Sequence, residues 1–214
     1  MIKRYRPESS SFSSGQVLQS PYDSKKARVV ALEMADAAAL DLVAKRLVTD
    51  QLVLTIGYDR ESLTRPEIRM LYHGEVTTDH YGRTVPKHAH GTVNLAGKTS
   101  SSRIIGQAVA ELYDRIVNPD LLIRRLNLTT CHVTDEALAS QPDTPQQLDL
   151  FTDYEALRRE HNEEQALLDK ERRMQEARLA IRRRYGKNAI LRGLNYEEGA
   201  TAKERNEQIG GHKA

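Results

Sequence analysis

Five consecutive residues combine an amide side chain with three apolar ones: Gln147-Leu148-Asp149-Leu150-Phe151. They follow a polar, proline-marked stretch at 140–146, which is typical of a linker, and they precede a highly charged segment. Apolar side chains in such a place have no core of their own to enter, and exposed apolar anchors usually fit a partner's pocket. The pattern therefore favours a docking motif. The alternative is that the three apolar side chains staple the charged segment onto the preceding domain.

A second group of residues offers hydroxyl and basic groups of the kind that bind phosphate oxygens. The run Lys98-Thr99-Ser100-Ser101-Ser102-Arg103 stands at the start of a predicted helix. The free N–H groups and the dipole of a helix N-terminus favour an anion, so this run predicts a phosphate contact. Serine clusters also cap helices or form flexible loops, and the capping role is compatible with phosphate binding.

Histidine and cysteine side chains raise the question of a metal site. His88 and His90 alternate on one predicted strand, and Cys131-His132 lie on a later one. Zinc sites usually show tighter Cys/His spacing, and the chain has no Cys-x-x-Cys pair. We therefore predict no metal site, a core thiol for Cys131, and no catalytic residue. A metal-dependent enzyme built on these histidines is the alternative.

Composition limits the class of protein. The chain has 214 residues, 39% hydrophobic, 29% charged and 5% aromatic, which suits one domain with a charged extension. No apolar run reaches the ~18 residues of a membrane helix, and the basic N-terminus lacks the apolar core of a signal peptide. One cysteine excludes an internal disulfide and suits a reducing cytoplasm. A net charge of +2 neither demands nor excludes a nucleic-acid partner.

The hydrophobic patterns predict four strands and two helices before residue 135. The strands are expected at 10–18, with Phe12 buried, 51–59, 88–95 and 121–133, and the helices at 22–48 and 103–117. Residues 60–87 are harder to assign, and we expect an extra hairpin at 72–76 and 79–82. The predicted domains are a linker at 1–9, a folded domain at 10–135, a linker with the docking motif at 136–151 and a charged, mainly helical tail at 152–214.

The order β-α-β-β-α-β predicts an α+β, ferredoxin-like fold with one four-stranded sheet and two helices on one face. The other sheet face is then open and polar, with Arg125, Asn127 and Thr129 beside His90, Thr92 and Asn94. In the tail, Leu167, Met174 and Ile181 recur every seven residues amid mixed charge. This narrow stripe fits a solvated helix that packs weakly, a docking helix for a partner, or a short coiled coil.

Four stretches of the chain resemble the C-terminal part of bacterial Y-family DNA polymerases of the ImpB/MucB/SamB type. They are Ser10 to Gln16 running into Glu33 to Asp36, Asp50 to Asp59, Tyr81 to Leu95, and the end from Tyr185 to Ala214. In that family the β-α-β-β-α-β module is the little finger, which lies on DNA beside the catalytic core. The pentapeptide at 147–151 is similar to the motif by which bacterial repair proteins dock on the DNA sliding clamp.

The resemblance implies a DNA-binding, clamp-tethering region of an error-prone translesion polymerase of the SOS response, cytoplasmic and associated with the nucleoid. Its partners would be primer-template duplex, through the phosphate backbone, and the bacterial sliding clamp, with no membrane. The expected DNA-binding residues are Ser11, Ser13, Ser14, His90, Thr92, Lys98, Thr99, Ser100, Ser101, Arg103, Arg124, Arg125 and Asn127.

The catalytic motifs of such polymerases lie in an N-terminal palm, to which no residue here corresponds. We therefore expect no cofactor and no polymerisation from this chain alone, whereas the catalytic part would need Mg²⁺. The alternative is a regulatory or decoy protein that competes for the clamp or for DNA. A palm domain in the upstream reading frame would decide between the two.

Overall fold

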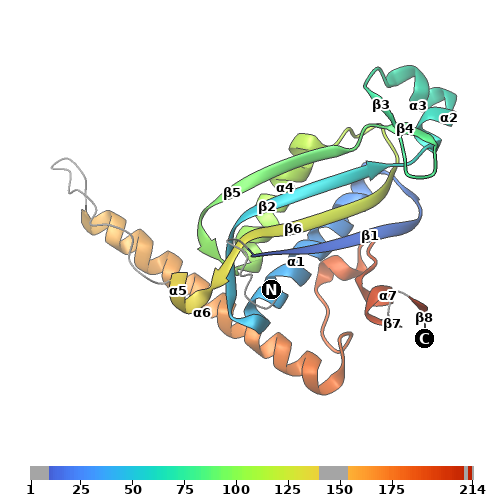
Figure 1. The fold of residues 1–214 in the computed structure, drawn as a ribbon. Coiled ribbons are helices and arrows are strands. Elements are labelled where there is room, and N and C mark those ends of the chain that lie inside the picture. Colours follow the sequence, from blue (N-terminus) through green and yellow to red (C-terminus); the bar gives the residue numbers. More distant parts are fainter. Residues whose placement is uncertain (1–9, 140–153, 210–211, 214) are drawn as a thin grey trace, which may run out of the picture.

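The computed structural model describes residues 10–139, 154–209 and 212–213, and its centre is one four-stranded sheet (Figure 1). The strands are β1 (Ser10–Tyr22), β2 (Leu47–Tyr58), β5 (Ala89–Thr99) and β6 (Ile123–Asp135), in the spatial order β1-β6-β2-β5 with every neighbouring pair antiparallel. The helices α1 (Ser24–Lys45) and α4 (Ser102–Ile116) contact each other on one side of this sheet. The predicted β-α-β-β-α-β order is confirmed.

Two interlocked β-α-β units build the sheet. Because β1 and β2 both pair antiparallel with β6, they run parallel to each other, and α1 joins them across the intervening strand. In the same way α4 joins β5 to β6 across β2. Each unit is thus split by a strand of the other, which is the arrangement that the ferredoxin-like prediction requires.

The core lies between the sheet and the two helices. Leu52, Leu54 and Ile56 alternate along β2 and are fully buried, as their spacing predicts. They meet Ile105 of α4 and Val30 of α1 in the same hydrophobic cluster. The Asp23 carboxylate accepts a hydrogen bond from the Lys26 N–H at 2.8 Å and so caps α1.

One prediction about the core is wrong. Phe12 was expected to be buried, yet 42% of it is exposed to solvent. Its ring lies on the helix side of β1, where α1 ends, and packs under the Lys45 ammonium at 4.3 Å from the ring centroid. No further turn of α1 is present to cover it.

An insertion of about 30 residues separates β2 from β5 at one end of the sheet (Figure 1). It contains α2 (Glu61–Thr64), α3 (Pro66–Leu71) and the hairpin of β3 (Val76–Thr78) with β4 (Thr84–Pro86). The hairpin exists, but its strands lie later than predicted. The Asp79 carboxylate accepts from the Tyr81 and Arg83 N–H groups, which makes residues 79–83 the turn.

The remaining elements follow β6. A short helix α5 (Glu136–Ala139) ends the first described range, and the long helix α6 (Tyr154–Tyr185) opens the second. The 3₁₀ helix η2 (Gly193–Tyr196), α7 (Ala202–Asn206) and the pair β7 (Gln208–Ile209) and β8 (His212–Lys213) complete the chain. Among these helices none combines the length and the apolar character needed to cross a bilayer.

Candidate nucleic-acid interface

The sheet face that points away from α1 and α4 is a continuous polar surface, which we call the open face. On each strand its residues alternate with those that enter the core. The open-face residues are Ser11, Ser13, Gly15 and Val17 of β1, Gln51, Val53, Thr55 and Gly57 of β2, His90, Thr92 and Asn94 of β5, and Arg125, Asn127, Thr129 and Cys131 of β6. None of these carries a carboxylate.

Hydrogen bonds between neighbouring strands orient the polar side chains of the open face. Ser13 Oγ donates to Asn127 Oδ1 at 2.7 Å, and Gln51 Nε2 donates to Asn94 Oδ1 at 2.8 Å. His90 Nδ1 lies 2.9 Å from Thr55 Oγ1. Because both asparagine oxygens accept from inside the sheet, their Nδ2 groups are left as donors to an approaching ligand.

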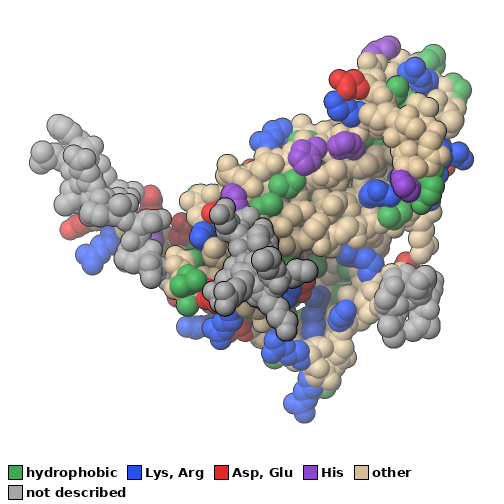
Figure 2. Space-filling model, in the orientation of Figure 1, with side chains coloured by type: hydrophobic (Ala, Val, Ile, Leu, Met, Phe, Trp, Pro, Cys, Tyr) green, Lys and Arg blue, Asp and Glu red, His purple; other side chains and the backbone are tan. Residues whose placement is uncertain are grey.

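Arg125 is the one lysine or arginine among the open-face residues named above. It is exposed, and it lies opposite Gly57 in the β2–β6 pairing. A Cβ at Gly57 would come within 3.2 Å of the Arg125 Cβ, so the glycine makes room for this side chain. Figure 2 shows histidine and scattered basic side chains over this face, with acidic side chains near its edges.

Two of the residues predicted on strands β1 and β6 are not on this face. Ser14 shares the helix side of β1 with Phe12 and Leu18, although it is exposed there. Arg124 lies at the sheet edge, where Nη1 donates to the Gln19 carbonyl at 3.0 Å and Nε lies 3.7 Å from Asp59 Oδ2. The structure thus gathers Ser11, Ser13, His90, Thr92, Asn127 and Arg125 on one surface and separates these two from it.

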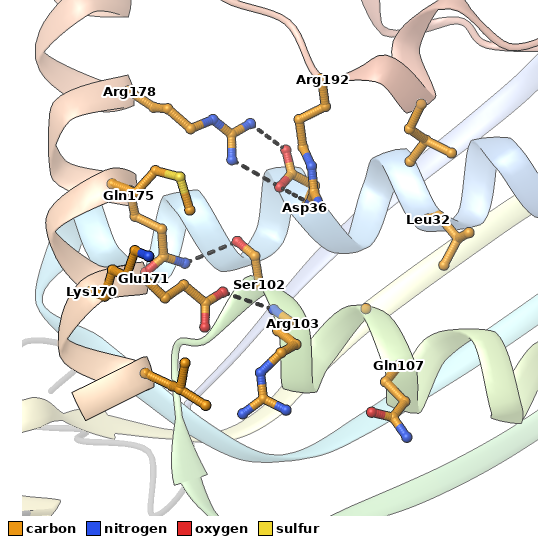
Figure 3. Close-up of a pocket in the computed structure, with 14 residues that line it drawn as sticks. Leu32, Asp36, Ser102, Arg103, Gln107, Lys170, Glu171, Gln175, Arg178 and Arg192 are labelled. Atoms are coloured by element: carbon orange, nitrogen blue, oxygen red, sulfur yellow. Dashed lines mark hydrogen bonds and ion pairs between the residues drawn. The ribbon is translucent and has the colours of Figure 1, made fainter. Parts of the chain in front are cut away.

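The predicted anion site at the start of α4 holds a carboxylate of the chain itself. Glu171 of α6 accepts from Ser101 Oγ at 2.5 Å through Oε2. Its Oε1 accepts from the Arg103 N–H at 2.9 Å (Figure 3). These are the groups expected to bind phosphate. They belong to the helix layer, so the run from Ser100 to Arg103 lies on the opposite side of the sheet from the open face.

The neighbouring predicted residues also serve the contact with α6. Ser100 Oγ accepts from Arg172 Nη1 at 3.0 Å, and the Ser100 carbonyl accepts from Gln175 Nε2 at 3.0 Å. Thr99 Oγ1 accepts from the Ser101 N–H at 3.0 Å. Lys98, the last charged residue before this run, is exposed at the end of β5.

His90 and His132 contact neighbouring side chains within the sheet, and Cys131 lies on the open face, not in the core where it was predicted. His132 Nδ1 lies 2.9 Å from Asp50 Oδ1, far along the strands from His90, which contacts Thr55. Burial raises the pKa of the Cys131 thiol, which favours the protonated form. No group of three or more metal-ligating side chains converges within the described part of the chain.

The model of the impB/mucB/samB family C-terminal domain matches residues 9–150, more than half of the chain and all of the sheet with its two helices. The chain belongs to the impB/mucB/samB family. The resemblance noted in the sequence is therefore confirmed, and the matched domain is the C-terminal region of a Y-family DNA polymerase of this type. No curated protein matches the chain.

In this impB/mucB/samB chain, the described residues beyond the matched domain fold back on α1 through two buried carboxylates that sequence reasoning missed. Asp36 accepts from Arg178 Nη2 at 2.7 Å and from Arg192 Nη1 at 2.8 Å (Figure 3). Glu33 accepts from the Thr201 and Ala202 N–H groups at 2.8 and 3.0 Å. The available signal was the i, i+3 pair of acids among the apolar residues of α1.

The pentapeptide at 147–151 lies outside the residues that the structure describes. The next described element in the sequence is α6, which begins three residues after the pentapeptide. The described side chains of α6 from Glu155 to Leu167 are exposed, and the N-terminal part of the helix projects away from the sheet domain (Figure 1).

Proposed function

We propose that the open face binds the phosphate backbone of duplex DNA without sequence preference, as part of a translesion DNA polymerase. The observation that carries this proposal is a four-stranded surface with no carboxylate, outward amide donors at Asn94 and Asn127, and a cation at Arg125. Hydrogen bonds from such groups to phosphates position a protein on DNA but carry no sequence information. The family of the matched domain supplies the polymerase context.

The helix layer is the less suitable surface for DNA. Its best anion site, the α4 N-terminus, is filled by Glu171, and α6 covers the serines around it. A phosphate at that position would have to displace a carboxylate that already makes two hydrogen bonds. The backbone of the open face is also accessible at Gly15. The atom nearest to the position that a Cβ would take there is the Leu126 carbonyl oxygen, at 4.0 Å, so a ligand can approach this strand closely.

We further propose that residues 147–151 tether the polymerase to the bacterial sliding clamp. The support is the Gln-Leu-Asp-Leu-Phe sequence and its place directly before the projecting end of α6. The contact of α6 with α4 that lies nearest its start is Glu164, 3.8 Å from Arg103 Nη2, and the stretch from Tyr154 to Glu164 is ~15 Å long at the rise of an α-helix. The start of α6 thus lies away from the domain, and a tether of this kind raises the local concentration of polymerase at the primer end.

The DNA proposal predicts that one arginine on each face behaves differently. Replacing Arg125 with Gln should weaken binding to any duplex and reduce the slope of log K against log salt by about 1, because one phosphate contact is lost. Replacing Arg103 with Gln, on the helix layer, should leave the slope unchanged. Fluorescence anisotropy at several salt concentrations measures both variants. Equal slopes for the parent and the Arg125 variant would remove the open face from the interface.

The clamp proposal predicts loss of binding without loss of stability. Changing Leu150 and Phe151 to Ala removes two apolar anchors, each worth ~1.5–3 kcal/mol on full burial. We expect micromolar clamp affinity for the parent, on the order of −8 kcal/mol, and none for the double variant. Calorimetry against the clamp and a thermal melt measure the two quantities. Unchanged affinity, or a melting temperature lowered by many degrees, would show that the two residues staple the tail instead.

A further inference from the structure

A groove of about 720 Å³ runs between α1, α4, α6 and the segment after α6 (Figure 3). Its apolar residues are Leu32 of α1, Leu167 and Met174 of α6, and Leu194 of η2, with Gly106 of α4 at its base. We call this the helix-layer groove. It lies on the side of the sheet opposite the open face, because α1 and α4 separate the two.

The apolar side chains that α6 contributes to the groove do not hold α6 in place. Leu167 and Met174 are each 58% exposed, and their spacing of seven residues puts them on one side of the helix. The contacts that attach α6 are polar, since Gln175 and Arg178 are buried against Ser102 and Asp36. The apolar side chains of Leu167 and Met174 are therefore not needed to attach α6 and remain exposed, which is typical of a surface that binds a partner.

Gly106 gives an independent reason to expect a close contact here. It lies within α4, four residues after the helix begins, where glycine is less favourable than alanine. No left-handed backbone angle requires it, and nothing lies within 4 Å of the position that a Cβ would take. Internal packing thus gives no reason for this glycine, whereas a bare stretch of helix lets another backbone approach closely.

The charges at the groove favour an acidic partner. The two carboxylates that line it are already used, since Asp36 binds Arg178 and Arg192, and Glu171 caps α4. Lys170 makes no ion pair within the described residues, and the Arg103 guanidinium makes only a long, exposed ion pair, 3.8 Å from Nη2 to Glu164 Oε1. The rim of the helix-layer groove therefore carries positive charge that an acidic partner would complement.

We propose that the helix-layer groove binds an amphipathic, acidic helix of a partner protein. Apolar side chains of that helix contact Leu167 and Met174, a small residue lies over Gly106, and carboxylates face Lys170 and Arg103. Grooves of this kind recognise anchors at i, i+3, i+4 and i+7. The proposal does not rest on DNA or clamp binding, and it leaves the open face free when the groove is filled.

The test uses a fluorescein-labelled helical peptide of about five turns, with Leu on one face, one central Ala on that face, and Glu elsewhere. Anisotropy measures its binding to the full chain and to Met174→Lys. The matched control is Met70→Lys, because Met70 of α3 is 70% exposed and lies outside the groove. We expect micromolar binding by the parent and the control, and at least tenfold weaker binding by Met174→Lys. No binding by the parent, or equal loss in both variants, would overturn the proposal.

A second variant separates groove filling from unfolding. Gly106→Ala should raise the melting temperature, because alanine favours the helix and meets no atom, while it weakens peptide binding at least tenfold. Unweakened binding would contradict the close approach. A peptide with Lys in place of Glu should bind at least tenfold more weakly, and equal binding would overturn the acidic partner. The alternative occupant of the groove is a second copy of this chain, and sedimentation of the parent tests for it. A dimer abolished by Met174→Lys would show that a second copy fills the groove.

Discussion

Two carboxylates of α1 determine where the C-terminal residues lie. Glu33 and Asp36 are 2% and 7% exposed, and a buried carboxylate without partners would cost several kcal/mol. Backbone N–H groups at Thr201 and Ala202 satisfy Glu33, and two guanidinium groups satisfy Asp36. The residues after α6 thus cover these two carboxylates of α1.

The Asp36 contacts make stability depend on pH. Burial opposes the ionised form, but Arg178 and Arg192 outweigh it and hold the pKa of this carboxyl below its usual range. A lowered pKa contributes stability that is present above the ordinary value, about 4, and is lost as the pH falls through the lowered one. Asp36→Asn should reduce the free energy of unfolding by about 3 kcal/mol at pH 7, because the two cations lose their partner.

Denaturant unfolding of the parent and Asp36→Asn across pH checks this expectation. The difference between the two should shrink as the pH falls below about 4 and be smallest below the lowered pKa of Asp36, where the folded parent is also neutral at this position. Glu61→Gln, at an exposed i, i+4 pair with Arg65, is the matched control and should change the free energy of unfolding by less than about 1 kcal/mol. A difference for Asp36→Asn that stays constant across this pH range would contradict the role given to its charge.

Among the elements, periodicity predicted the strands and helices of the domain, because each has a buried side. Leu52, Leu54 and Ile56 alternate, and Ile105, Val109 and Leu112 follow a helical spacing, so the fold class followed from the sequence. The ends were less accurate: β1 continues to Tyr22, and β6 runs from Ile123 to Asp135. Strand ends depend on pairing with residues far along the chain, which one sequence does not reveal.

The packing of α6 could not be predicted in this way. Its sequence shows an apolar stripe, whereas the residues that attach it are Gln175 and Arg178. A polar side chain is buried only where a specific partner satisfies its hydrogen bonds. The partners of Gln175 and Arg178 are Ser102 and Asp36, which lie more than 70 residues earlier in the sequence. For the same reason, the sequence predicted that an external phosphate binds the α4 N-terminus, whereas the carboxylate of Glu171 from the same chain binds there.

Two glycines after α6 test how tightly these residues pack on α1. Gly199 and Gly186 both have positive φ, +94° and +96°. A Cβ at Gly199 would lie 2.9 Å from the Lys26 Cα, whereas nothing lies within 4 Å of one at Gly186. Gly186→Ala should lose ~1–2 kcal/mol from backbone strain, and Gly199→Ala should lose more because it also pushes the tail off α1. Equal losses in denaturant melts would show that the contact contributes nothing.

For the whole molecule, the two sides of the sheet differ in chemistry. The open face carries hydroxyls, amides and Arg125, while the other side carries α1, α4, α6 and the helix-layer groove. The net charge of +2 is small, so attraction to DNA must come from where the charges lie rather than from their sum. Open-face residues without a carboxylate would provide this.

The measurement that tests the DNA face most directly is cross-linking from a single cysteine on each side. In a Cys131→Ser background, Thr92→Cys puts a thiol on the open face and Gln107→Cys puts one on α4, both at exposed positions. A duplex with a disulfide-activated tether on one phosphate is then added at low salt. If the open face binds DNA, we expect rapid cross-linking at position 92, which salt and competing duplex of any sequence should slow. We expect little cross-linking at position 107. Faster cross-linking at position 107 would contradict this expectation.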